Sequence, residues 1–339
     1  MNIQENVSLA PLCTFRIGGP AKYLIEVHTV DEVMMAVEFA HSRGLPILVL
    51  GGGSNMLISD HGFGGVVILM RLMGVECTLR DRETLYSVSA GVEWDAFVAR
   101  TVSDGYNELA NLSAIPGTVG ATPVQNIGAY GCEVRETIYS VLVFDLKKKK
   151  NILMMNEECK FGYRDSVFKK EKKDTCIILR VDFLLHKNSL PNISYKDISL
   201  VLGEKKNIVA QDVRDAVIAI RTKKFPDLRV TGTAGSFFQN PIVDSVLAKQ
   251  LQSVYTGMPV YPYHNGTVKI SAAWLIDKVA QLRGISVGQV GTHSEQALVV
   301  VNHGGANAVE VRTFAERIIH DVFHATGVKL VPEVEYVGE

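Results

Sequence analysis

The chain has 339 residues, of which 47% are hydrophobic, and its formal net charge is −1. A chain of this length can bury a large core, and we expect two or three domains rather than one. The nearly balanced charge excludes a generally basic surface, so we expect no nucleic-acid or membrane partner and only a local site for any phosphate group.

The cysteines and the apolar segments limit the compartment and the class of site. Five cysteines are an odd number and show no C-x-x-C spacing, which argues against a zinc site and against a disulfide framework. The first residues lack the pattern of a signal peptide, and no apolar run approaches the length of a membrane span. We therefore expect a soluble cytoplasmic protein that holds no metal.

The first predicted elements lead into a glycine turn. A strand over residues 21–27 precedes a helix that Thr29 or Asp31 caps and that ends at Gly44. A buried strand over residues 46–50 then runs into GGGSNML at residues 51–57. Successive N–H groups in such a turn form a nest for a phosphate or pyrophosphate, although a plain tight turn is the alternative. Neither a Rossmann fingerprint nor a P-loop is present.

An uncharged run follows a strand-like stretch at 66–90 and a predicted helix at 92–104. Residues 109–132 hold four glycines and two prolines, so the run is apolar enough to be buried and too broken to form a helix. Buried irregular backbone needs hydrogen-bond partners, and glycines let it approach another body closely. A flat cofactor with polar edges would supply both; a packed loop without a ligand is the alternative.

The second half of the chain alternates between strands and helices. We predict strands at 138–146 and 151–155, joined by a solvated turn of lysines at 147–150, then a strand at 175–186. A helix at 211–224 precedes Pro226, which we take as a domain boundary. The remaining segments indicate a compact α+β module: 245–252, 267–270, 272–279, 296–301, 308–325 and 328–337. The last of these is predicted as a strand with Glu333 and Glu335 on one face and Val334 and Tyr336 on the other.

Several segments together carry a family resemblance. PGTVGATPVQNIGAYG at 116–131 closely resembles the flavin-cradling segment of the UDP-N-acetylenolpyruvoylglucosamine reductase family. YRDS at 163–166, AGSFF at 234–238 and VPEVEY at 331–336 resemble the catalytic segments of that family. The resemblance spans Arg16 to Glu333, and the insertion that contains Tyr195 is typical of the longer type of the family.

The resemblance implies an α+β fold class with an FAD-binding fold of the vanillyl-alcohol-oxidase (PCMH) type. The implied divisions are FAD-binding subdomains at 1–70 and 71–225, a substrate-binding domain at 226–328, and a C-terminal strand at 329–339 that returns to the active site. It also implies non-covalent FAD, NADPH as co-substrate, and reduction of UDP-N-acetylglucosamine enolpyruvate to UDP-N-acetylmuramate by a monomer. This reaction belongs to peptidoglycan precursor synthesis and so to cell-wall formation.

Three residues match the catalytic positions of the family. Arg164 is implied to bind the substrate carboxylate with its planar fork, and a protonated Glu333 to donate a hydrogen bond to the developing enolate. Ser236 is implied to deliver the proton. Without the resemblance, a structural interpretation is favoured for each: Arg164 as a partner of Asp165 or Asp182, Ser236 as a turn residue, and Glu333 as a solvated carboxylate.

The resemblance also implies contacts with the cofactor and the substrate. The cofactor contacts are Arg16, Gly51, Gly52, Gly53, Ser54, Asn55, Met56, Pro116, Gly117, Gly120, Ala121, Gln125, Asn126, Ile127 and Gly128. The substrate contacts are Tyr163, Tyr195, Arg221, Lys224, Asn240, Tyr261, Lys269 and Gln296.

Two other functions are open on the residues alone. A flavin oxidase of the same fold would share both FAD loops, since fold does not fix chemistry. A non-catalytic module that binds flavin or nucleotide sugar and senses precursor supply would not need all of Arg164, Ser236 and Glu333.

Overall fold

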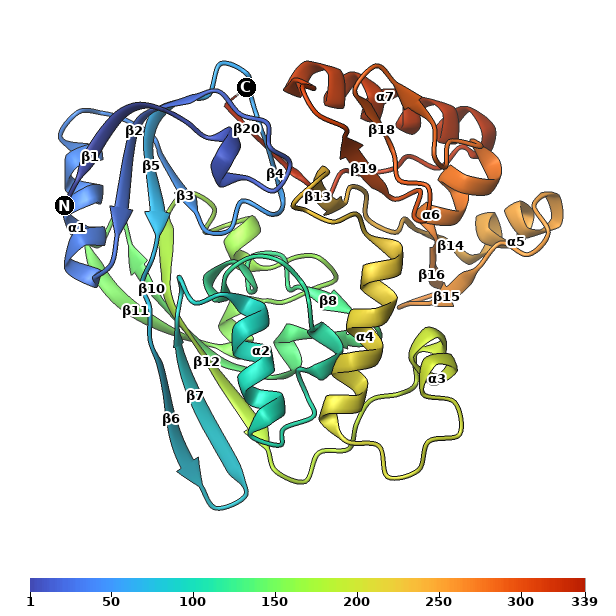
Figure 1. Cartoon of the computed structure of the whole chain (residues 1–339), viewed down its shortest axis with the longest axis horizontal. Coiled ribbons are helices and arrows are strands. Elements are labelled where there is room, and N and C mark those ends of the chain that lie inside the picture. The colour runs from blue at the N-terminus through green and yellow to red at the C-terminus, as the bar shows by residue number, and fades with distance from the viewer. Residues whose placement is uncertain (339) are drawn as a thin grey trace. The chain divides into compact units, whose positions relative to one another are not determined.

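The structure is a computed structural model that describes residues 1–338 (Figure 1). The chain divides into two compact units that each draw on several stretches of sequence. Unit 1 comprises Met1–Val7, Ala21–Gly52 and Gly64–Thr222, and unit 2 comprises Ser8–Pro20, Gly53–Phe63 and Lys223–Glu339. Each unit has its own hydrophobic core. The four-part division predicted from the sequence is a different partition and stays a prediction.

Unit 1 contains two sheets. The first has the order β1 (Ile3–Ser8), β2 (Pro20–Val27), β5 (Phe63–Met70) and β3 (Ile47–Leu50). The second has the order β11 (Lys150–Met155), β10 (Ile138–Asp145), β12 (Cys176–His186), β7 (Glu83–Ser89) and β6 (Val75–Arg80). The strand-like stretch at 66–90 is therefore three strands in two sheets. The predicted strands 138–146, 151–155 and 175–186 are confirmed within a residue or two.

The helices of unit 1 begin and end close to where the sequence places them. α1 (Val30–His41) is capped by the Thr29 side chain, which accepts from the Glu32 N–H at 3.2 Å, so the threonine of the two predicted caps is the one used. α2 (Trp94–Ser103) and α4 (Ala210–Lys224) match their predicted ranges. α3 (Lys196–Leu202) begins directly after Tyr195, the residue of the insertion noted in the sequence.

The uncharged run forms short pieces of structure in unit 1. It contains 3₁₀ turns at Ala110–Leu112 and Val119–Ala121 and ends in the small hairpin of β8 (Gly128–Ala129) and β9 (Cys132–Glu133). Three further 3₁₀ turns in this unit are Val134–Glu136, Asn156–Cys159 and Val167–Lys169. No long helix crosses the run, as its prolines predict.

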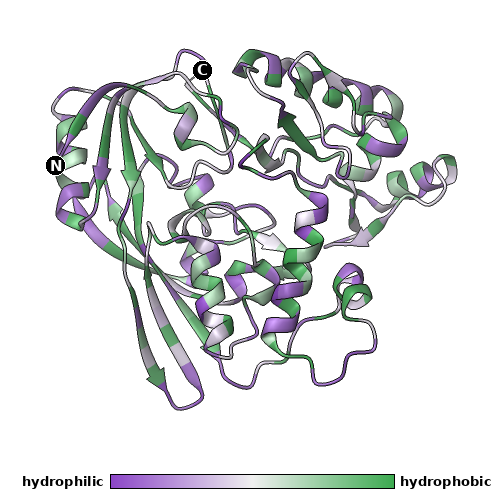
Figure 2. Ribbon diagram, in the orientation of Figure 1, coloured by the Kyte–Doolittle hydropathy of each residue, from purple (hydrophilic) through white to green (hydrophobic). Residues whose placement is uncertain are grey.

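Unit 2 is built on a four-stranded and a three-stranded sheet. The first has the order β13 (Gly232–Ser236), β19 (Val299–Asn302), β18 (Val290–Thr292) and β17 (Ser286–Val287). The second has the order β14 (Ile242–Asp244), β16 (Thr267–Ile270) and β15 (Val260–Pro262). All four residues of β19 are buried, and this strand is strongly apolar in Figure 2.

Four helical segments and one strand pair complete unit 2. They are a 3₁₀ turn at Ala10–Leu12, α5 (Ser245–Val254), α6 (Ala272–Trp274) with a π-helical turn at Leu275–Val279, and α7 (Ala308–Thr326). β20 (Glu335–Val337) pairs in parallel with β4 (Met56–Ile58). The Asp60 carboxylate accepts from the N–H of Ala308 at 2.9 Å and so caps α7. The alternation of helices and strands predicted beyond residue 243 is confirmed in outline.

Candidate active site

The glycine turn and the uncharged run lie against each other in unit 1. A Cβ atom added to Gly52 would lie 2.8 Å from the Cα atom of Gly117, and one added to Gly51 would meet the Thr118 hydroxyl. No side chain fits between these two stretches of backbone. They present bare peptide groups, which is the donor set that a flat cofactor with a pyrophosphate tail requires. The residues present therefore fit FAD.

The irregular backbone of the run finds its partners in the protein itself. The Gly117 carbonyl accepts from the Trp94 N–H at 3.0 Å, where α2 begins. The N–H groups of Val119 and Gly120 donate to the carbonyls of Val92 and Ala90, each at 2.9 Å. These bonds fix the run whether or not a cofactor is bound, so the interpretation that a cofactor supplies the partners is only part of the explanation.

Arg164 is fixed to the uncharged run in unit 1. Its Nη2 atom donates to the Gly128 carbonyl at 2.6 Å. Buried Asn126 donates from Nδ2 to the Gly162 carbonyl at 2.8 Å, and the Ser166 hydroxyl donates to the Val124 carbonyl at 2.6 Å. The loop that carries Arg164 is thus hydrogen-bonded to the uncharged run that is predicted to bind flavin. Among the carboxylates proposed as structural partners, Asp182 binds Arg180 at 2.8 Å and Asp165 binds Lys170.

Backbone strain gathers around these residues. Arg164, Asn126, Tyr130 and Ala114 have φ values of 53°, 46°, 49° and 58°, in the left-handed region that side chains other than glycine seldom adopt. Such conformations persist only where the surroundings enforce them, and they cluster at functional sites. Their concentration along one run and its neighbouring loop marks this part of unit 1 as a site.

Unit 2 brings Ser236 and Glu333 together. The Glu333 N–H donates to the carbonyl of Phe237 at 2.8 Å, and Phe238 forms an antiparallel bridge with Pro332. Ser236 ends β13 after a register shift, next to Gly235 with φ 76°; such a bulge re-aims the side chain that follows. Two residues 97 positions apart in sequence are therefore neighbours, as the resemblance implies.

Asn55, at the end of the glycine turn, is hydrogen-bonded to the backbone at Glu333 and Glu335 in unit 2. The Asn55 Nδ2 atom donates to the Glu333 carbonyl at 3.1 Å, and the Asn55 carbonyl accepts from the Glu335 N–H at 3.0 Å. Met56 then pairs with Glu335 in β4 and β20. Hydrogen bonds thus join the predicted cofactor loop at Asn55 to the predicted catalytic residue Glu333.

The predicted strand 328–337 is wrong in its extent. Only Glu335–Val337 forms a strand, and Glu333 precedes it and is half-buried rather than solvated. Pro332 has no N–H to give to a ladder, and residues 331–333 pair with 237–239 instead of continuing β20. The predicted alternation of faces therefore does not describe Glu333.

Predicted substrate contacts of unit 2 lie on the three-stranded sheet. Tyr261 and Lys269 are direct cross-strand neighbours in β15 and β16. The Asn240 Oδ1 atom accepts from the Ala272 N–H at 2.9 Å, just before β14. Half-buried Gln296 lies between β18 and β19, and Lys224 is the last residue of α4.

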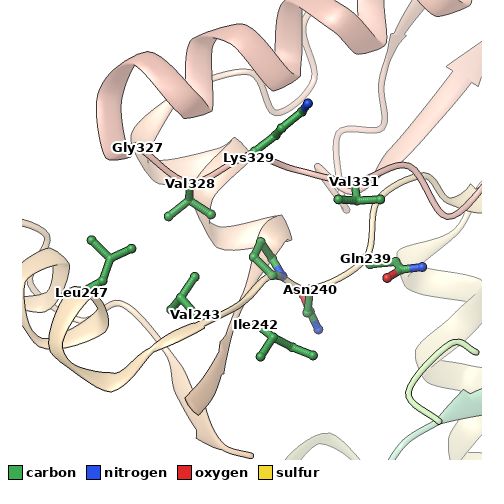
Figure 3. A pocket seen from close by; sticks show the side chains of 10 residues that line it. Gln239, Asn240, Ile242, Val243, Leu247, Gly327, Val328, Lys329 and Val331 are labelled. Carbon is green, nitrogen blue, oxygen red and sulfur yellow. The ribbon is translucent and has the colours of Figure 1, made fainter. Parts of the chain in front are cut away.

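A cavity of about 250 Å³ opens beside Asn240 in unit 2. Figure 3 shows Val243, Leu247 and Val328 gathered at one end of it, with Gln239 and Val331 at the other. Lys329 is the charged residue among those that line it. Ser236 and Glu333 do not line this cavity, so it is not the site that they form.

Predicted substrate contacts of unit 1 surround Tyr130. The ring of Tyr195 packs edge-on against the ring of Tyr130, with centroids 5.3 Å apart. Burial lowers the pKa of Arg221, whose Nε atom donates to the Ala114 carbonyl at 3.0 Å. The Tyr163 ring lies 5.3 Å from the guanidinium carbon of Arg164. Their contacts with a substrate stay predictions.

Arg16 has a structural role that the sequence did not indicate. Its guanidinium donates to the carbonyls of Leu228 and Val230, at 2.7 and 3.2 Å, within unit 2. Its predicted contact with FAD stays a prediction, as do those of Ser54, Ala121, Gln125 and Ile127.

Sequence reasoning missed a support beneath the uncharged run. The Asp95 carboxylate receives both Nη atoms of Arg214, at 2.6 and 2.8 Å, and the N–H of strained Ala114 at 2.5 Å. Burial raises the pKa of Asp95, but the hydrogen bonds from Arg214 and Ala114 outweigh it and hold that pKa below its usual value. The available signal was an acidic residue in the first turn of a helix, which alone indicates only a cap.

The remaining polar groups show no second type of site in the described residues. All five cysteines are free thiols. Within residues 1–338, no three side chains of His, Cys, Asp or Glu gather as metal ligands do. Nor does any helix in that range have the length and apolar character to cross a bilayer.

Family models match both halves of the chain. A model described as an FAD binding domain matches residues 21–146, and one described as the C-terminal domain of UDP-N-acetylenolpyruvoylglucosamine reductase matches residues 227–337.

Curated relatives match almost the whole chain. The UDP-N-acetylenolpyruvoylglucosamine reductase of Ralstonia nicotianae is 41% identical over 94% of this chain and 95% of its own length. The Pseudomonas aeruginosa enzyme of that name is 41% identical over 98% of both chains, and the Neisseria gonorrhoeae enzyme is 40% identical over 99% and 97%. Among solved structures, UDP-N-acetylenolpyruvylglucosamine reductase from Thermus caldophilus matches with a TM-score of 0.71 over all of both chains at 24% identity, which shows the fold.

The fold and the paired loops define a flavin-dependent oxidoreductase with FAD as its cofactor. The predicted fold class, α+β with this type of FAD-binding fold, is confirmed. The chain belongs to the UDP-N-acetylenolpyruvoylglucosamine reductase family, whose members use FAD and NADPH.

Proposed function

We propose that the chain reduces UDP-N-acetylglucosamine enolpyruvate to UDP-N-acetylmuramate, with NADPH as the source of hydride. The observation that carries the proposal is the pairing of the Glu333 backbone with Phe237, directly beside Ser236, at 2.8 Å. It supports the joint action of a hydroxyl and a carboxyl on one substrate, the hydroxyl at the carbanionic carbon and the carboxyl at the enolate oxygen. The full-length relatives named for this activity support the choice of substrate.

The two loops of bare backbone hold the cofactor in this proposal. They are residues 51–56 and 116–128, whose glycines allow the close approach described above. When bound, FAD takes hydride from NADPH and supplies it to the terminal vinyl carbon of the substrate. That transfer places negative charge on the adjacent carbon and its carboxylate, and this charge is the main barrier that the protein must lower.

Arg164 and Glu333 address the developing charge. The guanidinium is held by the Gly128 carbonyl at 2.6 Å, and its planar fork matches the two oxygens of a carboxylate. Glu333 in its protonated form donates a hydrogen bond to the enolate oxygen. Both groups are placed by backbone bonds before substrate arrives, which is the condition for electrostatic stabilisation at low reorganisation cost.

Ser236 completes the reduction by giving its proton to the carbanionic carbon. A new C–H bond forms at this substrate carbon as the O–H bond of Ser236 breaks. The Ser236 hydroxyl then regains a proton through a relay of exchangeable groups. A serine hydroxyl is a weak acid, but a carbanion is a far stronger base, so the transfer runs downhill.

The nucleotide part of the substrate is held by residues away from the chemistry. We assign the diphosphate and uracil to Lys224, Asn240, Tyr261, Lys269 and Gln296, and we assign further substrate contacts to Tyr163, Tyr195 and Arg221. The cross-strand pairing of Tyr261 with Lys269 supports this assignment, since it sets an aromatic face beside an ammonium group. We expect the enzyme to act as a monomer in the cytoplasm.

An anaerobic two-step experiment tests the function. Purified yellow protein is mixed with NADPH until the flavin absorbance bleaches, and UDP-N-acetylglucosamine enolpyruvate is then added without oxygen. We expect the oxidised spectrum to return and UDP-N-acetylmuramate to form in an amount equal to the flavin. Flavin that stays reduced until oxygen enters would contradict the proposal and would indicate an oxidase of the same fold.

A further inference from the structure

We propose that Asn111 is a positioning residue for the nucleotide-sugar substrate, because it ties the segment that carries Tyr195 to the turn that carries Tyr130. The inference rests on the proposed function, in which Tyr195 contacts the substrate. Asn111 lies in the 3₁₀ turn Ala110–Leu112 of unit 1 and has no assigned contact with cofactor or substrate.

The side chain of Asn111 is committed to two distant carbonyls. It is 0% exposed, and its Nδ2 atom donates to the Tyr130 carbonyl at 3.0 Å and to the Asn192 carbonyl at 2.9 Å. Both partners are acceptors, so the orientation of the amide is fixed by chemistry, and both of its hydrogens are used. The Oδ1 atom is buried and has no hydrogen-bond partner in the described structure, so the NH₂ group holds the side chain in place.

Both carbonyls lead directly to the aromatic pair of Tyr130 and Tyr195. The two rings meet edge to face, at 5.3 Å between centroids and an interplanar angle of 89°. Tyr130 has a strained backbone with φ 49°, and its carbonyl is one of those that Asn111 binds. Tyr195 lies three residues beyond Asn192 and is the N-terminal cap residue of α3.

The segment that leads to Tyr195 is held by a few side-chain hydrogen bonds and by the Lys187 N–H, which donates to the Arg82 carbonyl at 3.0 Å. No strand or helix is formed between the end of β12 at His186 and the start of α3 at Lys196, a connection that appears as a long loop in Figure 1. The Asn192 side chain donates to the Cys132 sulfur at 3.2 Å, and its Oδ1 atom accepts from the Ser194 hydroxyl at 2.7 Å. Upstream, the Asn107 side chain donates to the Ser189 carbonyl at 2.8 Å. Asn111 is the buried member of this set.

This arrangement confines any movement of Tyr195 to a short arm. With the Asn192 carbonyl held, any movement of Tyr195 is confined to residues 193–195 and the helix behind them. The substrate then meets a ring that is already near its bound position, so less ordering is needed on binding. We call the two hydrogen bonds of the Asn111 side chain the Asn111 clamp. Loss of this clamp is expected to weaken substrate binding and to leave the reaction of the flavin with NADPH unchanged.

Asn111→Ala and Asn111→Ser test the clamp against Asn107→Ala as a matched control. Asn107→Ala removes a bond to the same segment but none to Tyr130. We expect Asn111→Ala to raise the KM for UDP-N-acetylglucosamine enolpyruvate by about tenfold or more, since two buried hydrogen bonds are lost. Asn111→Ser, which keeps one donor, is expected to give a smaller rise. The rate of flavin bleaching by NADPH is expected to match that of the wild type in all three.

Hydrogen exchange, read by mass spectrometry, supplies a readout independent of turnover. We expect faster exchange in residues 130–132 and 192–200 of Asn111→Ala, and faster exchange only near residue 189 of Asn107→Ala. Faster exchange in the former with an unchanged KM would overturn the positioning role. A wild-type protein that does not turn over the substrate, while the exchange pattern is as expected, would refute the proposed function and keep the clamp.

The wild-type protein alone gives a further test should the variants fail to fold. Addition of UDP-N-acetylglucosamine enolpyruvate is expected to slow exchange in 192–200 and in 130–132 together, since the Asn111 amide binds a carbonyl of each segment. Protection of 192–200 with no change at 130–132 would overturn the inference.

Discussion

Single residues of this protein are held in conformations that their own chemistry disfavours. Arg164, Tyr130 and Ala114 occupy the left-handed region, and each is held there by hydrogen bonds of its own side chain or backbone. Such strain costs about 1–3 kcal/mol per residue and is maintained only by surrounding contacts. In the proposed mechanism, this conformation sets the direction in which the Arg164 guanidinium meets the substrate carboxylate.

Ser236→Ala is expected to separate the two halves of the reaction. NADPH should bleach the flavin at the rate of the wild type, because no proton from Ser236 is needed there. Return of the oxidised spectrum on addition of the enolpyruvyl substrate should slow by at least about 100-fold. Stopped-flow absorbance measures both steps, and an equal loss in the two would show that Ser236 is not the proton donor.

Gly52→Ala is expected to impair retention of FAD. The new Cβ atom would lie 2.8 Å from the Gly117 Cα atom, so the two loops must separate. We expect FAD affinity to fall by about tenfold or more, as strain of this kind costs a kcal/mol or more. The ratio of flavin to protein absorbance after dialysis measures it. Gly64→Ala is the control, since nothing lies within 4 Å of its added Cβ atom, and an equal loss there would refute the explanation.

Helices α2 and α4 of unit 1 are joined by one ion pair that also supports a loop. Asp95 opens α2, Arg214 lies on α4, and the carboxylate receives the Ala114 N–H as well. Arg221, two turns further along α4, donates to the Ala114 carbonyl. Ala114, whose backbone is strained, is therefore hydrogen-bonded at both its N–H and its carbonyl by side chains of these helices.

Acid should weaken this junction. Because the pKa of Asp95 is lowered in the folded state, its contribution to stability is present above the pKa of an unfolded aspartate, about 3.9, and is lost as pH falls through the folded value. Asp95→Asn is expected to lower the free energy of unfolding at pH 7 by about 1–2 kcal/mol, because the pair is half-buried and its loss lies between the values for exposed and buried pairs. It should also flatten the decline between pH 5 and pH 3.

Urea unfolding at several pH values measures both effects of Asp95→Asn. Asp174→Asn is the control, because Asp174 is exposed and asparagine tolerates its φ of 57°. Equal slopes against pH for the wild type and Asp95→Asn would contradict the assigned pKa shift.

The elements show which signals a sequence carries and which it lacks. The ends of α1, α2 and α4 follow from apolar spacing and a cap, which are local, and the structure has them nearly where predicted. The last strand was predicted too long, because pairing of residues 331–333 with 237–239 is non-local and leaves no mark in the pattern. The supports at Asp95 and Asn111 were missed for the same reason: their partners lie up to 119 residues away.

At the scale of the whole molecule, the five thiols differ in access. Burial raises the pKa of Cys13 and Cys159 to about 12, and that of Cys132 and Cys176 to about 11. Cys77 on β6 is exposed. The thiolate is the reactive form. Cys13, Cys132, Cys159 and half-buried Cys176 are therefore shielded from reagents by the surrounding protein and also stay protonated at neutral pH.

A chromogenic aromatic disulfide reagent at pH 8 is therefore expected to modify one thiol per chain quickly. Cys77→Ser should remove that fast phase, and all five thiols of the wild type should react once the protein is unfolded in guanidinium chloride. More than one fast thiol in the native protein would contradict the burial described here.

The parallel pairing of β20 with β4 joins residues that the ribosome makes far apart in time. Asn55 and Glu333, which share a hydrogen bond, are 278 positions apart. Segment 53–63 must therefore wait through most of translation before its pairing partner emerges. A chain released early lacks both that strand and the Glu333 carboxyl group beside it, so we expect premature termination to yield an inactive product under the proposed mechanism.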